Sequence, residues 1–544
     1  MDTSFSGQDA TSASSPYIFW ANLNFDRWDN DFPFSYPEQD DQQIAFCPAA
    51  PSTITPDCNY SNVLANGYAY RAIPDTRDLE DYARLWVCGV TTNLLAQLPS
   101  GSTVTLSWGD VGSPNSGNPT IDIFQAADPD GGIGYQTNEI TAQVQTNFLQ
   151  CRYVGRLGPG QSIQLNSSQF NGWAGNHFIW CGANYGNGGL TMTIADGSGN
   201  VLAQTTAYIQ IEDIKQMYER WTVGDRPSVA PLTNAILTTE GLPAGMSAFE
   251  YTPPTDPNTP YILLVHGYNM KPWEKDRYAE TAYKRLYWQG YQGRFGMFGW
   301  PTAQNAVQFG ASESQAWLSA QGLLNKLNDL NAEYPGHVYL AAHSLGNVVA
   351  GEALGLAGST PVVNTYVAMQ GAVASHAYDP STTAYNLGAF YDGAPDCYAH
   401  YWTAGASCYF NATAGAGTYV NFFNTNDWAL ANAWLVFQDA KPSLSPSYSY
   451  TAGTGAYYKN FGITELFFPG DRYDLFANFI QAPCYALGMQ PNVGGKFATA
   501  RQVELDIPPY NFSTQHIYHS GEFRSDNPQR WQFWNQLLVQ MRLK

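Results

Sequence analysis

The second half of the chain contains short, almost entirely apolar runs separated by longer stretches with a helical pattern. Residues 261–265 read Tyr-Ile-Leu-Leu-Val, and residues 338–342 read Val-Tyr-Leu-Ala-Ala. A strand buried on both faces has no polar face, so these runs predict central strands of a parallel sheet. The stretches between them place apolar side chains three and four residues apart, as helices covering a sheet do. The pattern predicts an α/β fold with a mostly parallel sheet over residues 226–544.

The region before it follows a different pattern. Between residues 78 and 210, short segments such as 103–108 and 190–194 alternate apolar and polar side chains, and clusters of Gly, Asn, Pro and Asp separate them. A period of two predicts half-buried antiparallel strands, so we expect a β-sandwich-like accessory domain over residues 16–225. One helix is expected at 211–221, and residues 1–15, rich in Ser, Thr and Ala, are expected to be disordered.

Two long stretches of the second half show no periodicity. Residues 371–418 and 439–490 are irregular, and the first is rich in Tyr, Ala and Gly. We expect these stretches to be two insertions in the domain over residues 226–544, and a loop as long as the first is usually functional. Aromatic side chains of the first, Tyr378 among them, are expected to bind substrate; a merely structural insert is the alternative.

The composition restricts the possible partners. The 544 residues carry a formal net charge of −20, and charged residues make up only 13% of the chain. Nucleic acids and anionic membranes are bound by clustered Lys and Arg, so we expect neither as a partner. No apolar run reaches the length of a membrane span, so no span is expected. The oligomeric state stays open.

Eight cysteines and a surface rich in uncharged polar residues are typical of extracellular proteins. We therefore expect a secreted protein with disulfide bonds, although a set of buried thiols is the alternative. The residues Met1-Asp2-Thr3 have neither the basic start nor the apolar core of a signal peptide, so this interpretation requires a leader absent from the sequence. The expected pairs are Cys47 with Cys58, Cys397 with Cys408 and, more loosely, Cys151 with Cys181.

Acidic residues cluster near the N-terminus. Asp26, Asp29 and Asp31 lie within a few positions of one another. Such oxygen ligands could hold a structural Ca²⁺, which takes six to eight of them. Their spacing does not match an EF-hand loop, and a solvated acidic loop is the alternative.

The strongest chemical signal is the pentapeptide Ala342-His343-Ser344-Leu345-Gly346. An apolar strand ends there and a small-residue helical pattern begins, so the chain must turn sharply at Ser344. This is the strand–turn–helix context of a nucleophile elbow, in which small residues let the strand and helix backbones approach each other. Ser344 is therefore the candidate nucleophile.

Three motifs together resemble the α/β-hydrolase superfamily of lipases and esterases, in particular its bacterial secreted members. They are His266-Gly267-Tyr268-Asn269 after the first apolar strand, Trp300-Pro301-Thr302 after the next, and the elbow at Ser344. The resemblance is specific over residues 261–369, looser toward the C-terminus and absent from about the first 230 residues. It implies an α/β-hydrolase fold in which the backbone amides of Tyr268 and Leu345 form the oxyanion hole.

In that fold the triad runs in the order Ser, Asp or Glu, His, each at the C-terminal end of a strand. Asp427 follows an expected strand at 419–423, and His519 lies in a loop before the last helix. The resemblance thus implies a catalytic triad of Ser344, Asp427 and His519. His266 and His343 are expected to shape the substrate-binding site. Four alternatives remain open, namely Asp379, Asp392 and Asp396 for the acid and His516 for the base.

The expected function is that of a secreted serine hydrolase cleaving carboxylic esters through an acyl-enzyme, with no cofactor required. The aromatic, uncharged insertions favour a lipid, aryl or polymeric ester as substrate. A serine peptidase or acyltransferase would use the same site. A secreted binding or adhesion protein, in which the hydrolase domain is only a scaffold, is the alternative from another class.

Overall fold

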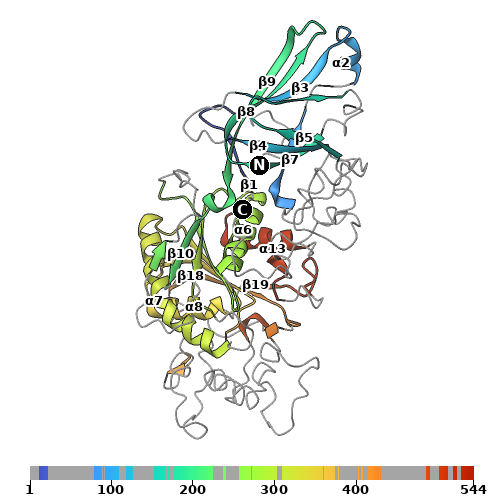
Figure 1. Cartoon of the computed structure of the whole chain (residues 1–544). Coiled ribbons are helices and arrows are strands. Elements are labelled where there is room, and N and C mark those ends of the chain that lie inside the picture. The colour runs from blue at the N-terminus through green and yellow to red at the C-terminus, as the bar shows by residue number, and fades with distance from the viewer. Residues whose placement is uncertain are drawn as a thin grey trace.

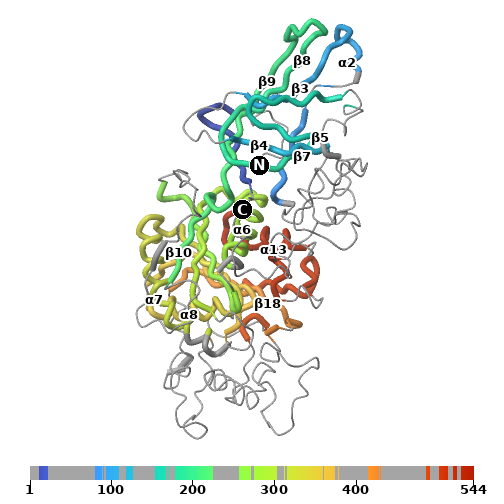
Figure 2. The backbone as a smooth tube through the Cα atoms, in the orientation of Figure 1, coloured from blue at the N-terminus to red at the C-terminus, as the bar shows by residue number. Residues whose placement is uncertain are grey.

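The fold is seen in a computed structural model of the chain. It describes residues 11–21, 79–87, 90, 92–109, 118–125, 152–166, 170, 177–223, 237–239, 256–270, 272–302, 309–358, 360–373, 378, 402–403, 406–407, 415–427, 429–430, 486–489, 501–512, 519–523 and 529–544. Figures 1 and 2 show two sheet-containing regions, one above the other, with α6 and α13 at their junction.

The first region is a single mixed sheet of nine strands. Its order is β5, β4, β7, β1, β9, β8, β3, β6, with β2 also paired to β7. Strand β1 is parallel to both of its neighbours, β7 and β9, whereas the other pairs are antiparallel. The bounds are β1 (Tyr17–Ala21), β2 (Tyr82–Trp86), β3 (Thr103–Gly109), β4 (Thr120–Gln125), β5 (Arg152–Leu157), β6 (Ser162–Leu165), β7 (His177–Asn184), β8 (Gly186–Ala195) and β9 (Val201–Asp213), with the 3-10 turn η2 (Leu79–Asp81) and helix α2 (Thr92–Gln97) beside them.

The second region is built on a sheet of eight strands in the order β11, β10, β13, β12, β14, β15, β18, β19. All neighbours are parallel except the edge pair of β10 and β11. The strands are β10 (Glu219–Val223), β11 (Leu237–Thr239), β12 (Tyr261–Val265), β13 (Arg294–Gly299), β14 (Val338–His343), β15 (Val363–Met369), β18 (Ala416–Phe423) and β19 (Arg501–Glu504). The helices are α6 (Pro272–Trp288), α7 (Phe309–Glu333), α8 (Gly346–Leu356) and α13 (Arg530–Met541), and the minor elements are η5 (Ile214–Gln216), β16 (Trp402–Thr403), β17 (Ala406–Ser407), η10 (Leu487–Met489) and η12 (Gly521–Phe523).

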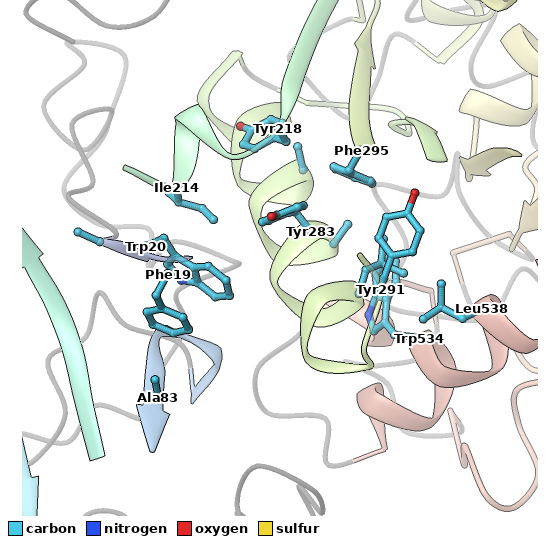
Figure 3. Close-up of a cluster of buried hydrophobic side chains, with 14 of the residues drawn as sticks. Phe19, Trp20, Ala83, Ile214, Tyr218, Tyr283, Tyr291, Phe295, Trp534 and Leu538 are labelled. Atoms are coloured by element: carbon cyan, nitrogen blue, oxygen red, sulfur yellow. The ribbon is translucent and has the colours of Figure 1, made fainter. Parts of the chain in front are cut away.

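Alternate residues of the central strands enter two different cores. Leu263 and Val265 of β12 pack in a core with α7 and α8, whereas Ile262 and Leu264 face a core with α6 and α13. This explains the unbroken apolar run of β12, because both of its faces are covered. The second core continues into the first sheet, and Figure 3 shows Trp20 of β1 facing α6 with Trp534 of α13 on the far side.

The fold class expected from the sequence, an α/β-hydrolase fold preceded by an antiparallel β-sandwich, is wrong. The first region is one mixed, barrel-like sheet with the parallel strand β1 at its centre, and not two packed antiparallel sheets. The described residues contain only five bounded α-helices, and three of them, α6, α7 and α8, connect strands of the second sheet. A period of two reveals a half-buried strand but neither its neighbours nor its direction, which explains the error in the first region.

The helix expected at 211–221 is also wrong. Strand β9 extends to Asp213, a 3-10 turn covers 214–216, and β10 begins at Glu219. Asp213 caps the turn, since its side chain accepts from the Lys215 amide while Gln216 reaches back to the Asp213 amide. Ile214, Met217 and Tyr218 contact the core shared with α6 and α13, whereas Trp221 of β10 packs against the core shared with α7 and α8. The helical spacing is therefore a coincidence of two strands and a turn, because pairing with neighbouring strands overrides local propensity.

Buried charges join the two regions. The Asp81 carboxylate, fully buried in η2, accepts from the indole N–H of Trp20 at 2.7 Å and lies 3.1 Å from the ammonium group of Lys284 in α6. The indole N–H of Trp288 donates to the backbone carbonyl of Glu80 at 2.7 Å. A buried carboxylate of this kind requires its partners, because desolvation of an uncompensated charge costs several kcal/mol.

We expect Asp81→Ala to lower the free energy of unfolding by about 3 to 5 kcal/mol, because it leaves the Lys284 ammonium buried without its carboxylate. Urea unfolding followed by fluorescence measures the change. The matched control is Asp329→Ala, which removes an exposed carboxylate from α7 and should change stability by less than about 0.5 kcal/mol. Equal effects of the two substitutions would contradict a structural role for the buried pair.

Candidate active site

Ser344 lies in a tight turn between β14 and α8. Its φ of 51° is in the left-handed region, which a residue with a side chain occupies only when its surroundings enforce it. The Ser344 amide donates to the carbonyl of Met369 in β15 at 3.0 Å, and the Ala372 amide donates to the Ser344 carbonyl at 2.9 Å. The predicted strand–turn–helix around Ser344 is therefore present in the structure.

Two glycines allow the backbones around Ser344 to approach each other. A Cβ on Gly346 would lie 2.5 Å from the backbone oxygen of His266, and a Cβ on Gly267 would lie 2.9 Å from the Cβ of Ser344. Both contacts are closer than real Cβ atoms allow. The loop after β12 and the start of α8 can therefore enclose Ser344 only with glycine at these positions.

The structure brings Ser344, His519 and Asp427 together. Nε2 of His519 is 2.9 Å from the Oγ of Ser344, and Nδ1 is 2.8 Å from Oδ2 of Asp427. Asp427 is fully buried, whereas 17% of the His519 side chain is exposed. An ionised carboxylate only accepts, so His519 carries its proton on Nδ1 and leaves Nε2 free to accept from the serine hydroxyl.

The Asp427 carboxylate is fixed by two further donors. The side-chain amide of Gln370 donates to Oδ2 at 2.8 Å, and the backbone amide of Leu430 donates to Oδ1 at 3.1 Å. Gln370 directly follows β15 and has a φ of 43°. Its backbone amide donates to the carbonyl of Phe422 in β18. The sequence analysis missed Gln370, although a polar residue directly after the buried strand 363–369 is a signal for the same sheet edge as Ser344.

The expected oxyanion-hole residues are neighbours in sequence of Ser344 and of Gly267, whose backbone lies close to Ser344. The Leu345 amide, at the N-terminus of α8, donates no hydrogen bond to any residue that the structure describes. The half-buried Tyr268 follows Gly267 in the loop after β12. Nδ1 of His266 donates to the Gly267 carbonyl at 2.8 Å. In a trans peptide the N–H points opposite to the C=O, so the Tyr268 amide points away from the His266 ring.

The three residues expected to bind substrate are all buried. His266 and Tyr378 are 0% exposed and His343 is 3% exposed. Both ring nitrogens of His266 are used, because Nε2 also accepts from the Trp300 amide at 3.0 Å while the two rings stack. Tyr378 packs in the core shared with α7 and α8, and a substrate-binding role for the three residues stays a prediction.

A buried glutamate that the sequence analysis missed lies beside the triad. Glu522 in η12 is 0% exposed, and its carboxyl lies 3.6 Å from Nε2 of His343. Neither carboxyl oxygen receives a hydrogen bond from another described residue. Burial raises the pKa of Glu522 to about 8, and the charge of Asp427 adds to the rise while Arg285 opposes it. Glu522 therefore holds a proton at neutral pH.

Glu522→Gln should stabilise the protein progressively as the pH rises from about 4.5 to about 8. In that window the folded wild type keeps a proton that the unfolded chain releases, so the wild type loses stability with rising pH and the glutamine variant does not. The difference in unfolding free energy should grow by on the order of 4 kcal/mol between pH 4.5 and pH 8. Urea unfolding at the two pH values measures it, with Glu333→Gln as the exposed control. An equal difference at both pH values would contradict a protonated Glu522.

Several expected residues lie outside the described part of the chain. These include the possible calcium ligands Asp26, Asp29 and Asp31, the alternative triad residues Asp379, Asp392, Asp396 and His516, and every cysteine except Cys181, which is buried in β7. Among the residues that are described, no group of three or more His, Cys, Asp or Glu side chains could hold a metal ion. None of the described helices is long and apolar enough to cross a membrane.

Comparison with known proteins gives no assignment. No protein-family description matches the chain, and neither does any curated protein. The resemblance to lipases and esterases stays a prediction from short motifs.

Proposed function

We propose that this protein is a serine hydrolase that cleaves carboxylic esters through an acyl-enzyme. The observation that carries the proposal is the continuous hydrogen-bonded chain from Ser344 through His519 to Asp427. Three residues separated by 175 and 92 positions in the sequence converge at one sheet edge. A serine hydroxyl needs a neutral imidazole as base, and the imidazole needs a carboxylate to fix its tautomer, and these residues meet both requirements.

In the first step, Oγ of Ser344 attacks the ester carbonyl while Nε2 of His519 takes the hydroxyl proton. The amides of Leu345 and Tyr268 would stabilise the negative charge on the carbonyl oxygen. The tetrahedral intermediate collapses, the C–O bond to the alcohol breaks, and His519 returns its proton to the leaving alcohol. Water, deprotonated by His519, then attacks the acyl-enzyme and releases the acid and Ser344.

The proposed substrate is an uncharged ester with an apolar acyl or aryl group, free or within a polymer. A formal net charge of −20 repels anionic metabolites. The low content of charged residues and the many tyrosines also support a secreted enzyme acting on such material. An active-site serine would serve a peptidase or acyltransferase equally well, and a binding protein with an inert site would leave Ser344 unreactive.

A p-nitrophenyl ester series from acetate to palmitate, together with a labelled fluorophosphonate, tests the proposal. We expect hydrolysis of at least one ester, and labelling that peptide mapping assigns to Ser344. The acyl-chain length that is hydrolysed fastest would indicate the length of the acyl pocket. Folded wild-type protein that neither hydrolyses any ester nor reacts with the fluorophosphonate would reject the serine hydrolase and favour the binding protein.

A further inference from the structure

The residue directly before the nucleophile contacts the backbone of the triad histidine. Nε2 of His343 is 3.0 Å from the backbone carbonyl oxygen of His519, and the two rings lie 5.0 Å apart. A carbonyl oxygen only accepts, so the proton of the His343 ring is on Nε2. Its Nδ1 is buried with no hydrogen-bond partner in the described chain.

The His343 ring is neutral at neutral pH. Burial, reinforced by the nearby His519, lowers the pKa of His343 to about 3. The Glu522 carboxyl, which is itself protonated at neutral pH, lies 3.6 Å from Nε2 of His343. The ring of Tyr278 in α6 and the ring of Phe523 pack against His343 from the other elements. His343 is thus a fixed neutral donor and cannot act as the base.

The short segment 519–523 is held to the rest of the fold through its backbone carbonyls. His343 donates to the carbonyl of His519, while the Trp534 indole N–H, at 2.8 Å, and the Arg285 guanidinium donate to the carbonyl of Glu522. The donors come from β14, α13 and α6. Of the three, only His343 acts at His519 itself, and it is covalently joined to Ser344.

We propose that His343 is a positioning residue that fixes the backbone of His519 relative to Ser344, so that one imidazole reaches both Ser344 and Asp427. This inference rests on the proposed function of the site. Because Ser344 and His343 are consecutive, the hydrogen bond sets the distance between nucleophile and base from within the elbow. Misplacement by about 1 Å at a catalytic group can cost about 100-fold in rate, so the contact matters to kcat.

Two substitutions distinguish a positioning role of the His343 side chain from a role that only fills space. His343→Leu keeps a side chain of moderate size but removes the donor, whereas His343→Gln offers an amide N–H at nearly the position of Nε2. We expect the leucine variant to lose about 10- to 100-fold in kcat with little change in KM, and the glutamine variant to recover most of the loss. Leu327→Ala in α7, a buried residue away from the triad, controls for lost stability and should keep its kcat.

A second readout does not depend on ester hydrolysis. With ¹⁵N-labelled histidine, the Nδ1 proton of His519, hydrogen-bonded to Asp427, should give a low-field resonance in the wild type. It should weaken or disappear in His343→Leu and return in His343→Gln. A folded leucine variant with wild-type resonance and wild-type kcat, or a glutamine variant no better than leucine, would overturn the inference. A wild-type protein that shows the resonance but neither hydrolyses esters nor reacts with the fluorophosphonate would instead reject the proposed function.

Discussion

Ser344→Ala should lower kcat for a p-nitrophenyl ester by at least about 10³-fold while leaving the fold intact. The alanine removes the hydroxyl oxygen that would form the acyl bond in the proposed mechanism, yet His519 and Asp427 keep their own hydrogen bond at 2.8 Å. The residual rate would come from binding and the oxyanion amides alone. KM should change little, because the hydroxyl contributes to bond formation and not to holding the substrate.

The matched control for this substitution is Ser319→Ala. Ser319 is also buried, but it lies in α7 and its hydroxyl donates to Gln315 of the same helix. Circular dichroism first checks that both variants fold. Their kcat and their labelling by the fluorophosphonate are then compared. The Ser319→Ala protein should react with the fluorophosphonate and hydrolyse the ester as the wild type does. A Ser344→Ala protein that retains turnover would show that another serine, or no serine at all, performs the reaction.

The elbow and the strands around it can be predicted from the sequence because their physical constraints are local. Residues 261–265 and 338–342 are apolar because β12 and β14 are fully buried. Position 346 is glycine because the backbone of His266 lies too close for a side chain. Asp427 can be chosen because it follows a strand of the same parallel sheet. Parallel strands bring their C-terminal ends to one edge, so residues distant in sequence meet there.

The remaining features of the fold and site depend on long-range contacts, which no local sequence pattern indicates. Strand β1 pairs with β7 and β9, which lie more than 150 residues further along the chain, and its five residues give no sign of their direction. The partnership of Asp81 with Lys284 spans 203 positions. Glu522 resembles any polar residue of a loop until the structure shows that it is fully buried. Sequence reasoning therefore identifies Ser344, Asp427 and His519 as neighbours but misses Gln370 and Glu522 beside them.

Asp427→Asn should lower kcat by about 10³- to 10⁴-fold although it replaces a single oxygen by an NH₂ group. Oδ2 accepts from both the His519 ring and the Gln370 amide, and Oδ1 accepts from the Leu430 amide. Asparagine has only one accepting oxygen. If its NH₂ group takes the place of Oδ2, it donates to Nδ1 of His519 and forces the ring proton onto Nε2, where the ring can no longer accept from Ser344.

The opposite rotamer of the introduced asparagine does not rescue the site, because the NH₂ group would then face the Leu430 amide, another donor, in a fully buried position. The loss should therefore persist across the pH range in which the wild type is active. Asp506→Asn is the control, because Asp506 bonds to Thr425 and Asn426 of the same loop without a bond to His519. Its kcat should stay within about threefold of wild type. Near-normal turnover by Asp427→Asn together with a crippled Asp379→Asn would assign the acid to Asp379 and reject the triad described here.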